Sequence, residues 1–199
     1  MSFVAGQAGA DGASAPQRYT GLSTFRSFSL LRDGIRQVLE CSALGGTSPK
    51  DIRKGTNLGT IQVEAMPKFA KAAGLLDKDG VLTELGRTLL ANDSALADCR
   101  SQWIVHYNLV APHSAAPVFW RKMFDYIAQR SVVTPDELHA CVRACDGGRA
   151  GERAVKYAYA AFVGTYTKRE CLGSLGVLAE ENNAFIVGHG SIPPQEVVA

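Results

Sequence analysis

Long apolar runs and a strong net charge are missing from this 199-residue sequence, and no leader segment is expected at its start. No run approaches the roughly 18 apolar residues of a membrane span, so no segment is expected to cross a bilayer. The formal net charge is +2, so no global field draws the chain onto polyanions, and any nucleic-acid binding must come from local patches. Residues 1–18 lack a basic start and a continuous apolar region, and their Gly, Ala and Ser content predicts a disordered tail rather than a secretory signal.

Cysteine is sparse and odd in number, with five residues and no dense disulfide framework. This usage is typical of a reducing compartment, and we expect a bacterial cytoplasm. Cys141 and Cys145 lie four apart on one predicted helix. A metal site would need Cys99 or His139 at a spacing that no common zinc or iron–sulfur site uses. The sequence therefore predicts small buried cysteines and no bound metal.

Motifs of catalysis are also missing. The glycine-containing segment GTNLGT, residues 55–60, lacks the Gly-Lys-Ser/Thr ending of a phosphate-binding loop. Neither a Gly-x-Ser-x-Gly elbow nor a His-Glu-x-x-His pair occurs. We therefore expect no catalytic residue, no cofactor and no enzymatic activity.

Apolar residues make up 46% of the chain, enough for one domain or two small ones, and their spacing predicts a mainly α fold. Residues 19–91 have the order of a winged helix-turn-helix domain. A first helical stripe runs from Phe25 to Leu39, and Ser48 caps a second helix. A third helix is closed by Gly74, Asp79-Gly80 predicts a hairpin wing, and Thr83 caps the next helix.

The third helix of a winged helix usually enters the major groove of DNA, so its outward side chains matter most. Successive residues of a helix are about 100° apart around its axis, which predicts the residues that face outward. With Ile61, Ala65 and Phe69 inward, Val63 and Pro67 are predicted to point outward. Residues 48–71 carry five basic side chains against two acidic ones. The candidate nucleic-acid-binding residues here are Lys50, Arg53, Lys54, Thr56, Asn57, Thr60, Gln62, Lys68 and Lys71.

The same outer face argues against sequence-specific recognition of bases. It offers no Arg, it carries Glu64, and it is expected to expose Val63 and Pro67. Phosphate contact and protein contact are therefore both open for this surface, with Val63 and Pro67 as the candidate partner-binding residues.

Residues 92–130 are predicted to form a helical connector whose aromatic residues are mostly core. His106 lies among these aromatics without a metal-spaced partner, which favours a hydrogen-bonded structural histidine. Residues 131–199 predict a second winged-helix-like unit. TPDEL (134–138) is a capping box, helices are expected to Cys145 and over 152–166, a short helix over 168–174, and a hairpin in LGVLAEENNAFIVG.

The segment from Arg143 to Arg169 is the most basic of the chain, with six basic residues against Asp146 and Glu152. It is a second candidate for phosphate contact, through Arg149, Arg153, Lys168 and Arg169. The alternative is a solvated helix face.

Several segments together resemble a known family. They include FRSFSLLRDGI, LGTIQVEAMPKFAKAAGLL, LTELGRTLL, SQWIVHYNLV, TPDEL and TYTKRECLGSLGVL, in that order. They resemble an uncharacterised, winged-helix-containing prokaryotic domain family encoded beside DNA-phosphorothioation (Dnd-type) and related anti-phage loci. That family has a Trp-x-x-x-His segment after the first wing, whereas this chain has Trp-x-x-His at Trp103 and His106. The resemblance implies an accessory role in defence or DNA modification and transfers no active site.

Two functions from different classes follow. The first is a DNA-binding accessory protein, largely without sequence specificity, in a prokaryotic DNA-modification or anti-phage defence system. The second is an assembly subunit that uses the winged-helix surface to hold a protein partner. The expected partners are duplex DNA and other proteins of the same system, with a homodimer as a further alternative and no membrane contact.

Overall fold

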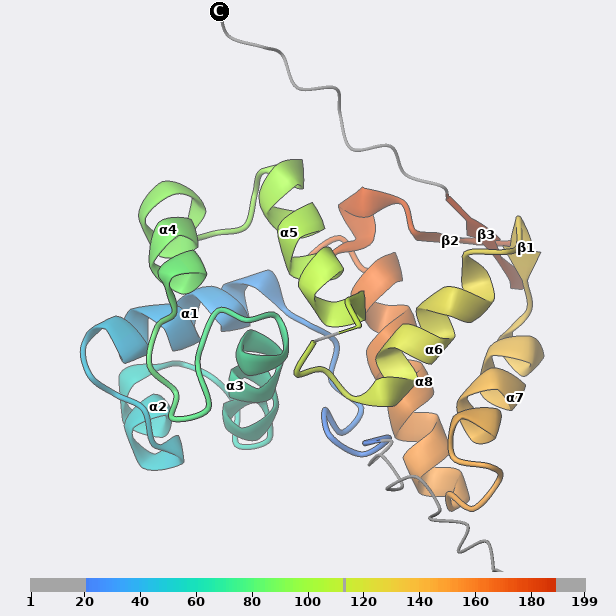
Figure 1. The fold of residues 1–199 in the computed structure, drawn as a ribbon, viewed down its shortest axis with the longest axis horizontal. Helices are drawn as coiled ribbons and strands as arrows, with labels where there is room; N and C mark the ends of the chain where they lie inside the picture. The colour runs from blue at the N-terminus through green and yellow to red at the C-terminus, as the bar shows by residue number, and fades with distance from the viewer. Residues whose placement is uncertain (1–20, 113, 189–199) are drawn as a thin grey trace, which may run out of the picture.

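The computed structural model describes residues 21–112 and 114–188, and the fold is given for these residues (Figure 1). The described chain is mainly helical, as the sequence predicts, with a small sheet near its C-terminal end. The helices are α1 (Arg32–Ala43), α2 (Pro49–Gly55), α3 (Gln62–Ala72), α4 (Glu84–Asp93), α5 (Cys99–Val110), α6 (Val118–Ile127), α7 (Pro135–Cys145), α8 (Glu152–Thr167) and the 3-10 turn η1 (Gly173–Leu175). The strands are β1 (Val132–Val133), β2 (Leu178–Glu181) and β3 (Ala184–Val187).

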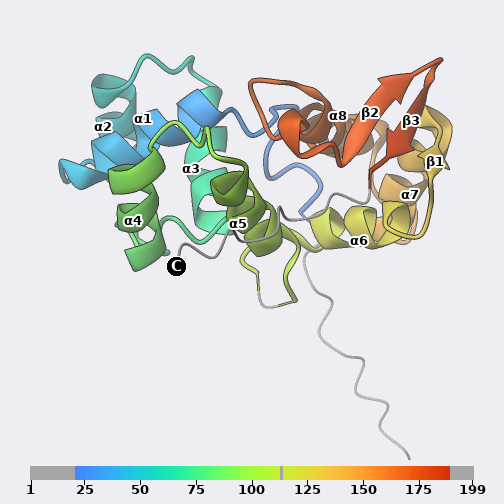
Figure 2. The same cartoon turned by 90° about the horizontal axis from the view of Figure 1, so that it is seen from above.

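The helices form two groups that share one hydrophobic core. Helices α1–α4 lie at one end, α6–α8 and the sheet lie at the other, and α5 lies between them (Figures 1 and 2). Phe25 stacks on Phe69 of α3, with ring centroids 3.8 Å apart, and meets Trp120 of α6 edge-on at 5.4 Å. Trp120 in turn lies 5.3 Å from Phe162 of α8. Aromatic contacts therefore run without a break from one helix group to the other.

Side chains form capping hydrogen bonds at the starts of the helices that the sequence predicts most clearly. Ser48 and Asp51 form a reciprocal capping box on α2, and Thr134 and Glu137 form another on α7. The Thr83 hydroxyl accepts the Gly86 N–H at the start of α4. These local hydrogen bonds satisfy backbone donors that a helix start leaves unpaired, and the three predicted starts are confirmed.

The prediction that the first helix contains Phe25 and Phe28 is wrong, because α1 begins at Arg32. Arg26 has a left-handed backbone, φ 53°, which interrupts any helix there. The Arg32 N–H bonds to the Glu170 carbonyl at 3.1 Å, so a distant segment fixes where the helix starts. Phe25 is still buried, because turns rather than a helix direct it into the core.

The predicted outer face of α3 is also partly wrong. Val63 is only 2% exposed and belongs to the core, whereas Ile61, expected inward, is 48% exposed. The helix begins at Gln62, and its buried face runs through Val63, Met66, Phe69 and Ala70, which repeat at three and four. Val63 therefore cannot serve as a partner-binding residue, while Pro67 is half-buried.

The two predicted hairpins differ in extent. The first is one antiparallel bridge between Leu76 and Leu82, with a turn in which Asp77 accepts the amides of Asp79 and Val81. The second is a true hairpin, β2–β3, whose turn residues Asn182 and Asn183 are both left-handed.

Two features near the second hairpin were not foreseen. Strand β1 pairs antiparallel with β3, giving the sheet order β1-β3-β2. The short helix expected over 168–174 is wrong, because turns and η1 replace it. There the Gly173 amide bonds back to the Lys168 carbonyl, and a side chain at Gly173 would meet that backbone. No helix within the described ranges is long and apolar enough to cross a membrane.

Candidate nucleic-acid interface

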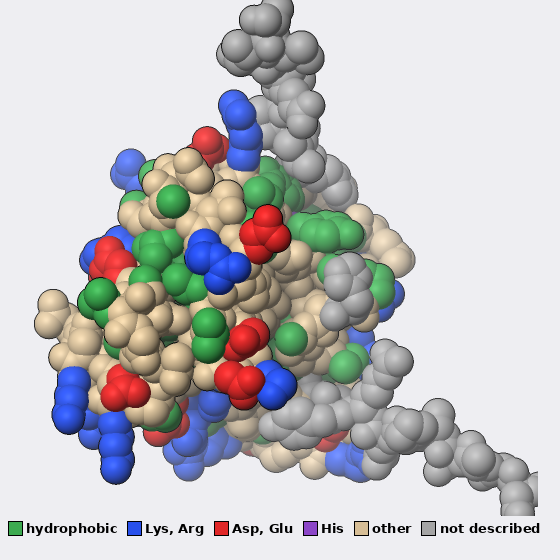
Figure 3. All heavy atoms as spheres, turned by 60° about the vertical axis from the view of Figure 1, so that its left-hand side comes forward, with side chains coloured by type: hydrophobic (Ala, Val, Ile, Leu, Met, Phe, Trp, Pro, Cys, Tyr) green, Lys and Arg blue, Asp and Glu red, His purple; other side chains and the backbone are tan. Residues whose placement is uncertain are grey.

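Helices α2 and α3 present five basic side chains on one end of the molecule. Lys50, Arg53 and Lys54 come from α2 and are exposed, because only Ile52 of that helix is buried. Lys68 on α3 is exposed, and the half-buried Lys71 donates its Nζ to the Lys78 carbonyl at 2.9 Å. Within the described residues, none of the five belongs to an ion pair. Figure 3 shows Lys and Arg side chains projecting along the lower edge of this end.

The predicted polar residues beside these cations divide into two kinds. The Thr56 hydroxyl donates to the Ile52 carbonyl at 2.6 Å, and the Gln62 side chain accepts the Gly59 amide at 2.9 Å. Each therefore has a structural bond at the ends of α2 and α3. Asn57 and Thr60 are exposed, and the Asn57 backbone amide is held by the Gln37 side chain at 2.8 Å. Asn57 and Thr60 are the pair whose side chains face solvent.

A groove of about 280 Å³ lies between α2 and α3. Its lining combines an apolar floor with a charged rim: Thr47, Pro49, Ile52, Val63, Glu64, Pro67, Lys68 and Lys71. Glu64 is the acidic member, and Arg26 neutralises it through an ion pair of 3.4 Å between half-exposed side chains. Because of this pairing, the acid on α3 subtracts little from the positive charge of the surface.

Asp51 is the other acid of this region, and it is held at the start of α2. Hydrogen bonds from the Ser48 hydroxyl and the Ser48 backbone amide keep the pKa of its carboxyl below the usual value. The carboxylate is turned toward the cap, where it also complements the helix dipole.

The second predicted basic segment does not form one patch. Arg153 lies at the first turn of α8 and Lys168 just after its last turn, about 22 Å apart at 1.5 Å per residue. Arg149 shares the first end and donates to the Asp146 carbonyl at 3.1 Å, whereas Arg169 shares the second, where its carbonyl accepts from Arg32. The middle of α8 is packed into the core, so the four predicted residues form two separate pairs.

Arg143 is not a free cation, because it forms an ion pair of 2.6 Å with Glu152. It is therefore not a candidate for phosphate contact. Arg153 donates to the Tyr157 hydroxyl at 2.7 Å and keeps its charge at the surface. Charge is thus present at both ends of α8 but less concentrated than the sequence suggested.

His106 is a buried structural residue, as predicted. Its Nδ1 lies 2.9 Å from the Tyr166 hydroxyl, which also accepts the Trp120 indole N–H at 3.1 Å. The indole N–H can only donate, whereas the hydroxyl donates to Nδ1 or accepts from it according to the imidazole tautomer. Burial lowers the pKa of His106 to about 4. Within the described ranges, no group of three or more His, Cys, Asp or Glu side chains could hold a metal ion.

The aromatic-rich middle of the chain, which the assembly hypothesis also offers to a partner, exposes two large side chains. Ile104 and Tyr107 of α5 are 41% and 60% exposed, one turn apart on the same face. The available signal was that α5 is apolar around much of its circumference, more than a helix with one buried face needs.

These features define a class of protein: it is mainly helical, has a small antiparallel sheet, and presents a pair of helices with cationic side chains. The chain belongs to the DUF4007 family, a family of proteins of unknown function, whose model matches residues 55–185. The fold is similar to that of a crystal structure of SspB, with a TM-score of 0.60 and 17% identity. The match covers 88% of this chain and 61% of that one, and at this identity the likeness shows the fold alone. A search of curated proteins found no match.

Proposed function

We propose that this chain is a DNA-binding accessory protein of a prokaryotic DNA-modification or anti-phage defence system. One observation carries the proposal: five cations from α2 and α3 share a surface on which Arg26 neutralises Glu64. In the proposed arrangement, α1–α3 and the turn at 77–80 act as a winged helix, with α3 against the duplex. The resemblance of the sequence to a family encoded beside Dnd-type loci supports the cellular role. We propose no catalytic activity for the chain itself.

The binding is proposed to be largely independent of DNA sequence. Lys side chains neutralise phosphates as point charges, while base edges are read mainly by Arg, Asn and Gln. On α3 the single residue of those types is Gln62, and its side-chain oxygen is engaged with the Gly59 amide. Ile61 adds an exposed apolar side chain. Phosphate contacts therefore dominate, and the affinity depends steeply on salt.

The test is a salt titration of binding to a fluorescent duplex, followed by anisotropy. A variant with Lys50, Arg53, Lys54 and Lys68 all changed to Ala removes four exposed charges from the surface. Each lost phosphate contact reduces the slope of log K against log salt by about 0.9, so the slope should fall by roughly 3 to 4. At low salt the affinity should drop by at least about 100-fold.

The matched control removes four exposed charges elsewhere, at Arg87, Arg100, Arg121 and Lys156. Both variants have the same net charge, so a general field effect changes them equally. The proposal fails if the wild-type chain does not bind duplex DNA at low salt, or if both variants lose the same slope. Pairwise changes at Arg149 and Arg153, and at Lys168 and Arg169, then measure what each end of α8 contributes.

A second candidate function is protein–protein assembly, with a partner or a second copy of the chain. Burial of Val63 weakens the version in which the winged-helix surface holds the partner. Exposed Ile104 and Tyr107 favour α5 instead, because apolar and aromatic side chains dominate the energetics of protein interfaces. Size-exclusion chromatography with light scattering separates the cases. An oligomer that dissociates when Ile104 and Tyr107 are changed to Asp supports assembly, and a strict monomer that retains no partner opposes it.

A further inference from the structure

One side chain of α1 fixes the loop between α2 and α3, which comprises residues 56–61. Gln37 lies in the middle of α1, and its Oε1 accepts the backbone N–H of Asn57 at 2.8 Å. Its Nε2 donates to a carboxylate oxygen of Asp33 at 2.7 Å. Because Gln37 and Asn57 are 20 residues apart in the sequence, the first bond is a tertiary contact that joins the loop to a different helix.

The two partners of Gln37 require opposite halves of its amide. A backbone N–H can only donate and a carboxylate can only accept, so a single orientation of the amide satisfies both. Arg36 holds the Asp33 carboxylate with hydrogen bonds of 2.6 and 3.0 Å, and these bonds, with the bond from Gln37, lower the pKa of that carboxyl. Asp33 is therefore ionised near neutral pH, and it keeps the amide oxygen of Gln37 turned toward the loop.

The same side of α1 also supports the start of the loop. Asp33, Gln37 and Cys41 repeat every four residues, so they lie in successive turns along one side of the helix. A side chain at Gly55, where α2 ends, would come within 2.9 Å of the Cys41 Sγ. The chain therefore leaves α2 in close contact with α1, and Gln37 holds it two residues later.

The loop carries two exposed polar side chains, those of Asn57 and Thr60. They lie between the cationic helix α2 and the first turn of α3. The second half of the loop is tied to α3, because the Gly59 amide donates to the Gln62 side chain at 2.9 Å. The bond to Gln37 fixes the first half, so together the two bonds determine where both polar side chains lie.

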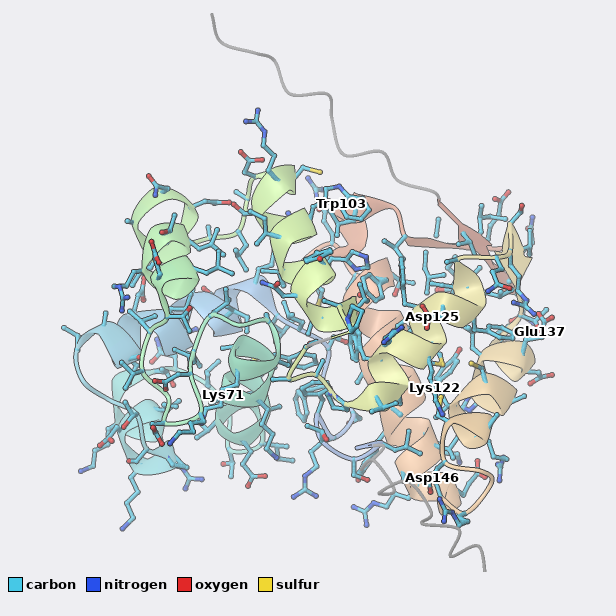
Figure 4. All side chains as sticks on the ribbon, viewed as in Figure 1. Lys71, Trp103, Lys122, Asp125, Glu137 and Asp146 are labelled. Carbon is cyan, nitrogen blue, oxygen red and sulfur yellow. The ribbon has the colours of Figure 1, made fainter. Side chains whose placement is uncertain are left out.

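The opposite end of α3 is anchored separately. Lys71, in the last turn of the helix, reaches the turn that follows α3 and donates its Nζ to the Lys78 carbonyl at 2.9 Å (Figure 4). This bond does not involve Gln37. A change at Gln37 should therefore loosen the loop and leave the far end of α3 in place.

We propose that Gln37 is a positioning residue of the DNA-binding surface, and that it holds Asn57 and Thr60 where they donate to phosphate oxygens of the duplex. This role rests on the proposed DNA-binding function and adds uncharged contacts beside the cations. Amide and hydroxyl side chains are common donors to DNA phosphates. Because they carry no charge, they raise the affinity without releasing further counterions, so they leave the salt slope unchanged.

The test uses the Q37M variant, which keeps the length of the side chain but has neither amide oxygen nor amide nitrogen. Anisotropy with a fluorescent duplex over a range of salt measures the affinity and the slope together. Q37M should bind about tenfold more weakly at each salt concentration, as loss of a hydrogen bond to a charged group generally causes, with the slope unchanged. The N57A/T60A variant should bind at least as weakly. Adding Q37M to it should cost less than about twofold, because a positioning residue acts only through the side chains that it positions.

The matched control is Q129M, the same substitution at an exposed Gln beyond the end of α6, and it should bind like the wild-type chain. Wild-type affinity in Q37M overturns the role of Gln37. So does an equal loss from Q37M in the wild-type and N57A/T60A backgrounds, which a general effect on the fold would produce. A wild-type chain that does not bind duplex DNA at low salt refutes the proposed function and this role with it. If the four-cation variant loses its slope as expected while Q37M has no effect, the role of Gln37 alone is refuted.

Discussion

At the scale of single residues, the buried Tyr166 hydroxyl joins three helices of the core through hydrogen bonds. It lies between His106 and Trp120, and within residues 21–112 and 114–188 it is the one polar group that either side chain contacts by a hydrogen bond. Tyr166 and Trp120 are fully buried, so neither group has water as an alternative partner. Two hydrogen bonds therefore join side chains from α5, α6 and α8, and burial keeps His106 neutral near pH 7 by lowering its pKa.

The neutral state of His106 predicts how stability depends on pH. The pKa of His106 is lowered from 6.5 to about 4 in the folded chain, so below pH 6.5 the unfolded chain binds the extra proton first. Its contribution is complete above pH 6.5 and is lost as pH falls toward 4, by about 1.4 kcal/mol per unit and about 3 kcal/mol in total.

Urea denaturation at a series of pH values measures this effect. Carboxyl groups titrate in the same range, so the informative quantity is the difference between the wild-type chain and H106Q, which has no imidazole. Between pH 6.5 and 4 the free energy of unfolding should fall less steeply for H106Q. Equal slopes for the two proteins would show that His106 has the same pKa in the folded and unfolded chain, which would contradict the prediction.

At the scale of elements, two capping boxes of the same chemistry begin helices in different places. Ser48 begins α2, which carries three of the proposed DNA-contacting cations, while Thr134 begins α7 at the far end. Changing either cap residue to Ala should lower the free energy of unfolding by about 1 kcal/mol, because a backbone donor loses its acceptor. Only S48A should also weaken DNA binding, since α2 has seven residues and depends strongly on its cap.

Chemical denaturation and DNA anisotropy on the same two variants provide the measurement. The T134A variant controls for general destabilisation, because α7 makes no part of the proposed interface. If S48A and T134A weaken binding equally, α2 is not the element that places the cations.

Elements with local signals could be predicted from the sequence, and those set by distant contacts could not. Ser48-Pro49, Thr134-Pro135 and the turn at Asn182 contain their own hydrogen-bonding and backbone preferences, so α2, α7 and β2–β3 were predicted correctly. The start of α1 depends on the Glu170 carbonyl, and β1 exists because β3 pairs with it.

The predictions for the candidate surface divide in the same way, into features set by local sequence and features set by distant contacts. The exposure of Lys50, Arg53 and Lys54 could be predicted, because Lys and Arg on a short polar helix have little alternative to solvent. The prediction for α3 placed Ala65 and Phe69 inward correctly but exchanged Ile61 and Val63, because both are apolar. Packing against α1 then decides between the two adjacent faces. The Arg26–Glu64 pair was also beyond reach, because it joins residues 38 apart in sequence.

At the scale of the whole molecule, the shared aromatic core predicts that both helix groups unfold together. Phe25 contacts Phe69 on one side and Trp120 on the other, and Arg32 donates to the carbonyls of Leu96 and Arg169. The F25A variant should lose about 3–5 kcal/mol, as truncation of a buried Phe generally does.

Native-state hydrogen exchange read by peptide mass spectrometry tests whether that loss is shared. The slowest amides of α3 and of α8 should both accelerate in F25A, and by a similar factor, because they are protected by the same global unfolding. Acceleration limited to α1–α4 would show that the two groups unfold separately.

The separation of the two basic pairs along α8 sets a length scale for nuclease footprints. B-form DNA rises about 3.4 Å per base pair, so the roughly 22 Å between Arg153 and Lys168 corresponds to six or seven base pairs. Neighbouring phosphates cannot occupy both pairs at once. A duplex touching both would show two short protected stretches with cleavable positions between them, whereas contact at one end leaves a single stretch.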